Sequence, residues 1–194
     1  MHPDELKAHL EAMLAVRPIA QVRVWGRDPA KVQAFAAEQA VRHQVAVEAA
    51  ASVAEAVRGA DIVCTCTSAH EPVLPGALLE PGMHVNAVGA SIPSWRELDT
   101  EAVRRSTLFT DRRESLEQEA GEYRLALAEG AIGPDHLRAE LGELLIGRHP
   151  GRTADEEVTL FRSLGLAVED LAAGRLAYRR ARELGIGTEV ALGS

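Results

Sequence analysis

The sequence of 194 residues has few cysteines, no excess of positive charge and no long apolar run. A net charge of −8 leaves no basic surface to neutralise a nucleic-acid backbone or an anionic membrane, so neither is predicted as a partner. No window comes near the roughly 18 consecutive apolar residues of a membrane span, and the first residues lack the apolar core of a secretion signal. A cytoplasmic location is therefore predicted.

The cysteines and histidines exclude further kinds of site. Cys64 and Cys66, the only two cysteines, stand two positions apart in an apolar run, where a strand would place them on one face without disulfide geometry. They are predicted to be buried free thiols, with a metal pair or a redox site as the alternative. The seven histidines show neither H-x-H nor H-E-x-x-H spacing, so no metal site is predicted.

Short apolar strands alternate with helical patterns along the chain. Strands are predicted at residues 22–25, 44–50, 61–67, 85–90, 107–110 and near 158–159, and helices at 6–16, 28–39, 52–58, 99–105, 117–128, 137–146 and 166–184. This alternation predicts an α/β fold with a Rossmann-like, doubly wound, mostly parallel sheet. In such sheets the ligand crevice lies outside the carboxyl ends of the strands, so the residues that follow each strand are the informative ones.

The turn after the strand at 22–25 bears on the choice of cofactor. A carboxylate at this position accepts a hydrogen bond from a ribose hydroxyl, whereas an arginine accommodates a 2′-phosphate. The chain offers Gly26 and Arg27, and the competing carboxylate of Asp28 is predicted to cap the following helix instead. NADP(H) is therefore preferred over NAD(H), with a plain surface arginine as the alternative interpretation of Arg27.

Two further strand ends carry small residues. Thr65, Thr67 and Ser68 would place hydroxyl groups where a ribose or a nicotinamide passes, although threonine and serine also simply end strands. Val88 and Gly89 would let a flat ring approach the backbone, with the Ser91 hydroxyl nearby. A tight strand-to-loop transition uses the same residues, and spacing alone does not separate the two interpretations.

Five stretches together resemble the ornithine cyclodeaminase and mu-crystallin family. They are VRVWGRDPAK, ADIVCTCTSAHEPVL, VNAVGASIPSWRELD, AELGELLIGRHPGRT and TLFRSLGLAVEDLAAGRLAYRRA, in family order between about Leu6 and Leu192. The resemblance implies a nicotinamide-dependent enzyme, usually a homodimer, that acts on a small imino or amino acid. It also implies that Gly26, Arg27, Thr65, Thr67, Ser68, Val88, Gly89 and Ser163 lie along the cofactor.

Ser91 separates the branches of the family. Ornithine cyclodeaminases have an aspartate at the matching position, whereas Ser91 followed by IPSWREL is similar to the mu-crystallin or ketimine reductase branch. A serine cannot serve as the carboxylate base that cyclodeamination uses near neutral pH. For reduction, the protein mainly has to orient an imine against the cofactor, which supplies the hydride. Ser91 is therefore the predicted substrate-facing, catalytic residue, and reduction of a cyclic ketimine or imino acid with NADPH is the predicted reaction.

The usual first strand of the fold and its glycine-rich loop are not found. About 20 residues separate the first glycine of that loop from the ribose-binding position, yet no glycine precedes Gly26. The absence of this strand is expected to leave two unpaired strand edges, which either pair with each other or are filled by another segment. Tight cofactor binding by this chain alone is not expected, because the glycine-rich loop and helix N-terminus normally bind the pyrophosphate. A missing N-terminal segment or a second chain is a predicted partner.

The predicted domains are an incomplete dinucleotide-binding domain at residues 1–152 and a C-terminal strand and helix at 153–194 that pack back on it, without the N-terminal substrate domain. Two other functions stay open. One is a non-catalytic remnant that binds a ligand or dimerises. The other is an ornithine cyclodeaminase, an ammonia-lyase, whose acid is supplied elsewhere.

Overall fold

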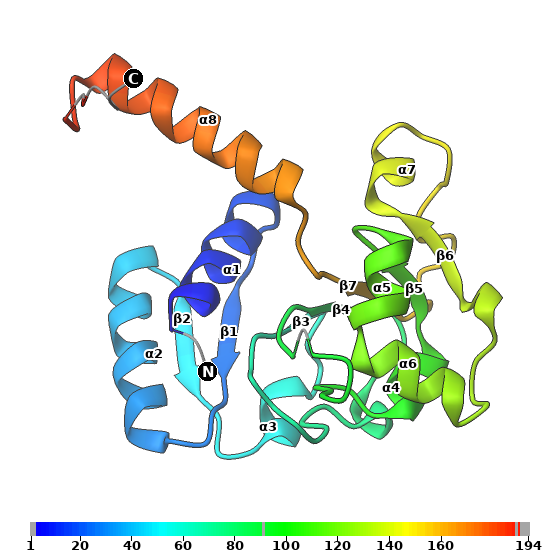
Figure 1. The fold of residues 1–194 in the computed structure, drawn as a ribbon. Helices are drawn as coiled ribbons and strands as arrows, with labels where there is room; N and C mark the ends of the chain where they lie inside the picture. Colours follow the sequence, from blue (N-terminus) through cyan, green and yellow to red (C-terminus); the bar gives the residue numbers. More distant parts are fainter. Residues whose placement is uncertain (1–2, 91, 189, 191–194) are drawn as a thin grey trace. The chain divides into compact units, whose positions relative to one another are not determined.

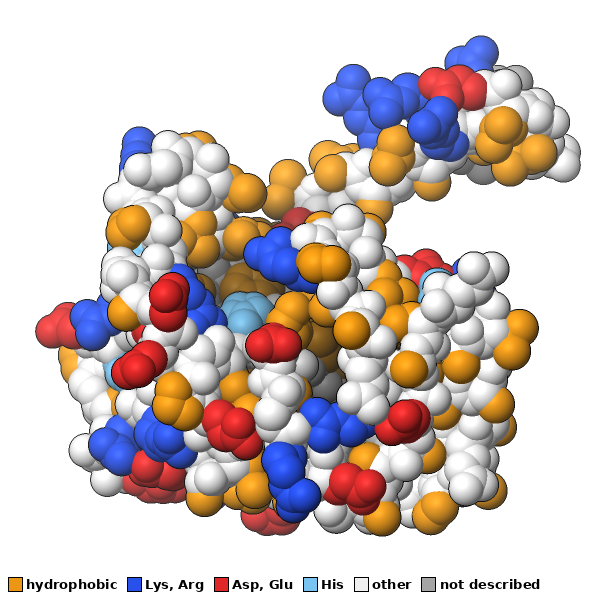
Figure 2. All heavy atoms as spheres, turned by 180° about the vertical axis from the view of Figure 1, so that it is seen from behind, with side chains coloured by type: hydrophobic (Ala, Val, Ile, Leu, Met, Phe, Trp, Pro, Cys, Tyr) orange, Lys and Arg blue, Asp and Glu red, His pale blue; other side chains and the backbone are white. Residues whose placement is uncertain are grey.

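The computed structural model describes residues 3–90, 92–188 and 190. It divides the chain into two compact units, Met1–Leu164 and Gly165–Ser194. All strands of the described residues belong to the first unit. The second contains the helix α8, Ala167–Leu184. Among the described helices, none combines the length and the apolarity needed to cross a membrane. Acidic and basic side chains are interspersed over the first unit on the face drawn in Figure 2.

The first unit alternates strands and helices, as predicted for an α/β fold (Figure 1). The strands are β1 (Gln21–Val24), β2 (Ala46–Ala49), β3 (Ile62–Thr65), β4 (His84–Ala87), β5 (Thr107–Thr110), β6 (Leu137–Glu140) and β7 (Thr159–Arg162). The helices are α1 (Pro3–Val16), α2 (Pro29–His43), α3 (Val53–Val57), α4 (Thr100–Arg105), α5 (Arg113–Glu119), α6 (Gly121–Ala128) and α7 (Leu141–Leu145), with short 3-10 turns at Gly76–Leu78 and Pro134–His136.

The strands form two parallel sheets rather than one. β1 pairs with β2, while the second sheet has the order β3-β4-β7-β5-β6. In a Rossmann sheet the first strand of the chain lies between the two halves, which is the place left open here between β1 and β3. The sequence predicts that the edges of β1 and β3 either pair with each other or are filled by another segment. Within the described residues β1 and β3 do not pair with each other.

Each sheet has its own apolar core. Val24, Val32, Phe35 and Val47 pack together around β1, β2 and α2, with Leu6 of α1 against them. The larger core joins β4, β5 and β7 to α4, α5 and α6. Its most deeply buried members include Val85, Val103, Leu108, Leu116 and Leu160. A strand covered by helices on both faces has to be apolar throughout, which explains the continuous apolar runs seen in the sequence.

The predicted helix starts at Asp28 and Ser52 are confirmed. The Asp28 carboxylate accepts a hydrogen bond from the Lys31 amide at 3.2 Å, and the Ser52 hydroxyl accepts one from the Glu55 amide at 3.1 Å. The Glu55 carboxylate in turn accepts from the Ala51 amide at 2.8 Å. These bonds satisfy amides that the helix itself leaves unpaired, so they fix where α2 and α3 begin.

Two predicted helices are wrong in part. The helix predicted at 137–146 is a strand, β6, followed by the short helix α7. In β6, buried Leu137 and Ala139 alternate with less buried residues, and this alternation has the period of a strand. The leucines at 137, 141 and 144 also fit the period of a helix, so the sequence pattern is ambiguous. The helix predicted at 117–128 is broken at Ala120 into α5 and α6.

Candidate functional site

A cavity of about 610 Å³ lies at the carboxyl ends of β1 and β3. Its wall includes Trp25, Gly26 and Arg27, which follow β1, and the segment from Thr65 to Ser68, which ends and follows β3. The predicted site residues from these two strand ends therefore share one cavity, as the rule for doubly wound sheets requires. Its volume is in the range of small-molecule sites.

Arg27 and Asp28 lie in different surroundings, and only the predicted cap at Asp28 is observed directly. The Arg27 side chain is exposed and belongs to the cavity wall. The Asp28 carboxylate caps α2, and its second oxygen lies 3.6 Å from the Lys31 ammonium group. Because the only carboxylate of this turn is engaged with α2, a cationic side chain is the charged group that the turn presents to the cavity.

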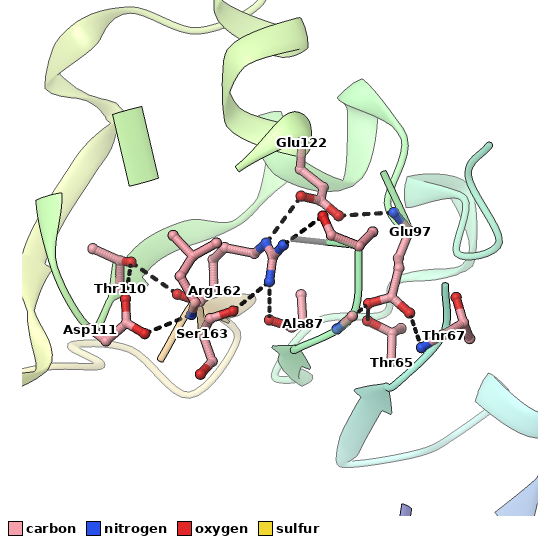
Figure 3. Close-up of polar contacts among 12 residues, drawn as sticks. Thr65, Thr67, Ala87, Glu97, Thr110, Asp111, Glu122, Arg162 and Ser163 are labelled. Atoms are coloured by element: carbon pink, nitrogen blue, oxygen red, sulfur yellow. Dashed lines mark hydrogen bonds and ion pairs between the residues drawn. The ribbon is translucent and has the colours of Figure 1, made fainter. Parts of the chain in front are cut away.

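The ends of β3 and β4 are joined through the carboxyl group of Glu97, whose residue is fully buried (Figure 3). One oxygen accepts hydrogen bonds from the Thr65 hydroxyl at 2.8 Å and the Gly89 amide at 2.9 Å, and the other accepts from the Thr67 amide at 2.5 Å. Burial raises the pKa of Glu97 above its usual value, and the hydrogen bonds from Thr67 and Thr65 oppose the shift. Glu97 thus fixes the backbone of both strand ends.

Gly89 lies where no side chain fits. A Cβ at this position would be 2.0 Å from the Thr67 carbonyl oxygen and 2.6 Å from the Thr67 nitrogen. The next residue, Ala90, adopts the left-handed conformation with φ of 56°, which is unusual for alanine. The Ala90 amide donates to the Thr67 carbonyl at 3.1 Å. The two loops after β3 and β4 are therefore in direct backbone contact.

A buried ion pair supports the adjoining strand end. Arg162, the last residue of β7, donates to the Glu122 carboxylate at 3.0 Å, and both side chains are almost fully buried. The Arg162 guanidinium also donates to the carbonyl oxygens of Ala87 at 3.0 Å and Ala90 at 3.1 Å. The other Glu122 oxygen accepts from the Glu97 amide at 2.8 Å, so one network links β3, β4, β7 and α6 (Figure 3).

The predicted site residues fall into three groups. Gly26, Arg27, Thr65, Thr67 and Ser68 line the cavity. Val88, Gly89 and Ser163 follow β4 and β7 and do not belong to its wall, although Ser163 is tied to β4 by its amide, which donates to the Ala87 carbonyl at 2.9 Å. Ser91, the predicted substrate-facing residue, lies outside the described residues.

The hydroxyl groups at the end of β3 differ in what they offer a ligand. The Thr65 hydroxyl is buried and donates to Glu97. The Thr67 hydroxyl accepts from the Ala69 amide at 3.1 Å, which leaves its own proton to donate elsewhere. Ser68 is exposed. The Thr67 and Ser68 hydroxyl groups can therefore donate to a molecule in the cavity, whereas Thr65 holds the strand end in place.

The two cysteines are free thiols. Cys66 is 3 % exposed, and burial raises its pKa to about 12. Burial also raises the pKa of Cys64. Among the described residues no group of histidine, cysteine, aspartate and glutamate side chains could hold a metal ion. Both thiols are protonated near neutral pH and so lack the thiolate that nucleophilic or redox chemistry needs.

A nicotinamide cofactor fits part of this arrangement. The cavity and the cationic side chain of Arg27 suit a dinucleotide laid across the strand ends. The space beside Gly89, where a flat ring was expected, is instead filled by the Thr67 backbone. In a Rossmann fold, the N-terminus of the first helix binds the pyrophosphate of the cofactor. In this chain the first turn of α1 contains Asp4 and Glu5, and their negative charges would repel a pyrophosphate. The cofactor would be held by the strand ends, with less help from the helix terminus.

Glu97, Glu122 and Arg162 are functional-site residues that the sequence did not reveal. Charged side chains are rarely buried, so a charge in a segment such as SWRELD or TLFR is expected on the surface. The one sequence signal is the position of Arg162 at the end of an apolar strand. Its partner Glu122 lies 40 residues away, and only folding brings them together.

Comparison with known proteins places this arrangement in a family. The model of the ornithine cyclodeaminase/mu-crystallin family matches residues 5–185. Mouse ketimine reductase mu-crystallin is 42% identical over 171 residues, which are 88% of this chain and 50% of that protein. A Delta(1)-pyrroline-2-carboxylate reductase of Bacillus cereus is 36% identical over 188 residues, which are 96% of this chain and 58% of that protein.

Solved structures agree with these relatives. Thermococcus litoralis Delta(1)-pyrroline-2-carboxylate reductase, in complex with NADH and L-proline, has a TM-score of 0.93 and 37% identity, covering 95% of this chain and 57% of that one. An archaeal alanine dehydrogenase dimer with bound NAD has a TM-score of 0.88 and 29% identity, covering 97% and 57%. This chain spans about half the length of the curated relatives it matches. It belongs to the ornithine cyclodeaminase/mu-crystallin family.

Proposed function

We propose that this chain is the cofactor-binding part of an NADPH-dependent enzyme that reduces a cyclic ketimine or a related imino acid. The family comprises NAD(P)-dependent imine and imino acid reductases as well as cyclodeaminases, and the relatives named above include two reductases of this type. Because the chain spans about half of their length, the reaction is that of a larger assembly to which these residues contribute. A homodimer in the cytoplasm is the proposed setting.

Arg27 is the observation that carries the cofactor preference. Its exposed side chain lies in the cavity wall directly after β1, and the neighbouring carboxylate of Asp28 is engaged by Lys31. A 2′-phosphate would gain a charged partner at this position, whereas the two hydroxyl groups of an NADH ribose would find no carboxylate to accept their hydrogen bonds. The bound ligands of the two solved relatives are NADH and NAD, so the preference proposed here rests on this turn and not on those relatives.

When bound, the cofactor supplies the hydride. The residues of this chain orient it and position the substrate. Gly89 lets the loop after β4 pack directly on the Thr67 backbone, and Thr67 and Ser68 offer hydroxyl groups along the cavity. Ser91 is proposed to face the substrate. It has no carboxylate with which to assist deamination, which favours reduction over cyclodeamination.

Binding of NADPH and NADH to the 194-residue chain tests the proposal. We expect weak binding of both, because the first turn of α1 is acidic, so saturation-transfer NMR with millimolar cofactor is the suitable measurement. NADPH is expected to bind about tenfold more tightly than NADH, which corresponds to one charge-assisted hydrogen bond. Arg27→Ala should abolish the difference, and Arg138→Ala, an exposed arginine on β6, should preserve it.

Three results would overturn parts of the proposal. Equal affinity for both cofactors in the unmodified chain contradicts the preference. If saturation is transferred from the protein to neither NADPH nor NADH, the proposed cofactor site itself is contradicted. Saturable micromolar binding, followed by the fluorescence of Trp25 and Trp95, contradicts the expected weakness that follows from the acidic turn.

A further inference from the structure

The side chain of His70 belongs to the wall of the cavity at the carboxyl ends of β1 and β3, and its ring is stacked on that of Trp95. The two ring centroids are 3.8 Å apart, and the ring planes are inclined by 20°. His70 is exposed, whereas Trp95 is half-buried. An exposed imidazole in the cavity wall therefore rests on an aromatic side chain.

The loop that contains His70 is held at both ends by Glu97. The Thr67 amide donates to the Glu97 carboxylate at 2.5 Å, and the Val73 amide donates to the Glu97 carbonyl oxygen at 2.7 Å. His70 lies midway between these two anchor points. Its stack on Trp95, two residues before Glu97, ties the middle of the loop to the same segment of the chain.

Trp95 is a firm support for the imidazole ring. Its amide donates to the Ile92 carbonyl oxygen at 2.9 Å. Its own carbonyl oxygen lies so close to Gly121, the buried first residue of α6, that a Cβ at position 121 would collide with it. Because the Trp95 backbone is fixed from both sides, the plane of the His70 ring is set before any ligand binds, which lowers the entropy cost of binding.

The ring nitrogens of His70 are available to a ligand. They lie at the edge of the imidazole, so stacking on its face does not cover them. In the part of the chain that the structure describes, no group forms a hydrogen bond with the His70 ring. The rings of His84 and His136, by contrast, are hydrogen-bonded. An imidazole always has at least one N–H group to donate, so His70 offers an unused donor.

The polar side chains that share the cavity wall with His70 are mostly hydrogen-bond donors. Arg27 contributes an exposed guanidinium, and Thr67 and Ser68 contribute hydroxyl groups. Glu71 is the one carboxylate among the wall residues, and it is exposed. A set of donors that includes a guanidinium matches the charge and the lone pairs of an oxyanion, such as a phosphate or a carboxylate group.

We propose that His70 binds an oxyanion of the ligand in this cavity, either a phosphate of the cofactor or the carboxylate of the imino acid, and that Trp95 positions the imidazole for this contact. The inference rests on the proposed function for the identity of the ligand. A histidine that only packed on Trp95 could be replaced by phenylalanine without loss, because phenylalanine also stacks but has no ring nitrogen. Binding and packing are therefore separable by one substitution.

An NMR titration of the chain with isotope-labelled histidine rings tests the proposal. The probes are inorganic pyrophosphate, for the phosphates of the cofactor, and L-proline, for the carboxylate, each added at constant pH. We expect the His70 signal, assigned by its loss in His70→Phe, to shift saturably with at least one probe. The His149 signal is the internal control, because this ring also contacts an aromatic side chain, Phe109, but does not belong to the cavity wall.

Two variants separate binding from packing. His70→Phe should weaken binding of the effective probe about tenfold, the loss of one charge-assisted hydrogen bond, and His149→Phe should leave it unchanged. Trp95→Leu keeps both nitrogens of His70 but removes the stack, so it should weaken binding about threefold. Saturation transfer to L-proline and the phosphorus NMR signal of pyrophosphate measure the affinities. If Trp95→Leu does not fold, His70→Phe, which replaces an exposed ring, still decides the matter.

The outcomes distinguish the source of the oxyanion. A response to pyrophosphate alone assigns the phosphate, and a response to L-proline alone assigns the carboxylate. No shift of the His70 signal with either probe, an equal shift of the His149 signal, or unchanged binding by His70→Phe would overturn the proposal. Unchanged binding by Trp95→Leu would overturn the positioning role of Trp95.

Failure of this inference and failure of the proposed function give different results. If the His70 signal responds while neither NADPH nor NADH receives saturation transfer, the proposed cofactor site fails and the oxyanion contact stands. If NADPH receives saturation transfer while the His70 signal responds to neither probe, the oxyanion contact fails and the cofactor site stands.

Discussion

The hydroxyl group of Thr65 donates a hydrogen bond of 2.8 Å to the carboxyl group of Glu97, 32 residues further along the chain. The same oxygen accepts from the Gly89 amide at 2.9 Å. A fully buried glutamate therefore holds the ends of β3 and β4 together beside the cavity. This side chain and the backbone bond from the Ala90 amide to the Thr67 carbonyl together place the two loops.

Replacing Glu97 should destabilise the chain strongly. Glu97→Ala leaves the Thr65 hydroxyl and the Thr67 and Gly89 amides without their acceptor, and we expect a loss of about 3 kcal/mol in the free energy of unfolding. Thr65→Val, the matched control, removes a single donor and should lose about 1 kcal/mol. Urea unfolding followed by circular dichroism measures both. Equal losses for the two variants would show that the amides do not depend on Glu97.

The ion pair between Glu122 and Arg162 should be strongly coupled. Arg162→Met leaves the buried Glu122 carboxylate without its cation and is expected to lose about 3 to 5 kcal/mol, and Glu122→Leu should lose a similar amount. The double variant should lose clearly less than the sum, because no unpaired charge stays buried. A double-mutant cycle in urea provides the coupling energy. Additive losses would mean that the two charges act independently.

A side chain at position 89 should disturb the site more than one at an open glycine. Gly89→Ala brings a Cβ to 2.0 Å from the Thr67 carbonyl oxygen, so the two loops must separate, and we expect a loss of more than about 2 kcal/mol. Gly142→Ala in α7 meets nothing within 4 Å and should be neutral or slightly stabilising, since alanine favours a helix. Thermal unfolding of both variants checks the difference. A Gly89→Ala chain as stable as the Gly142→Ala chain would contradict the close approach of the loops.

The Cys66 thiol should make stability depend on pH only in the alkaline range. Its pKa is raised by burial from the ordinary value of 9 to about 12 in the folded chain, so the folded state keeps a proton that the unfolded state loses. The contribution is fully present below pH 9 and is lost as the pH rises toward 12, with a slope of at most about 1.4 kcal/mol per pH unit.

The difference between the unmodified chain and Cys66→Ala isolates this effect from other groups that titrate in the same range. Their difference in unfolding free energy should be constant between pH 7 and about 9 and should shrink above it. Folded protein should also react with iodoacetamide at pH 8 far more slowly than protein in urea. Rapid alkylation of Cys66 in the folded chain would contradict the raised pKa.

The sequence by itself determined the α/β class, most element positions and the residues at the strand ends. These features follow from local rules: the period of apolar residues, the helix caps at Asp28 and Ser52, and the turn that presents Arg27. The open place between β1 and β3 was also predictable, because a doubly wound sheet needs a strand there. Local rules failed at residues 137–140, where leucine spacing fits both a helix and a strand, and sheet pairing with β5 decided the outcome.

Only the tertiary structure decided how the strand ends are held. Glu97 is joined to Thr65 across 32 residues, and Arg162 to Glu122 across 40, and no periodicity or motif connects positions so far apart. Their burial also runs against the usual preference of charged side chains for water. It becomes favourable only when folding supplies all their hydrogen-bond partners at once, which is a property of the assembled sheet and not of any segment.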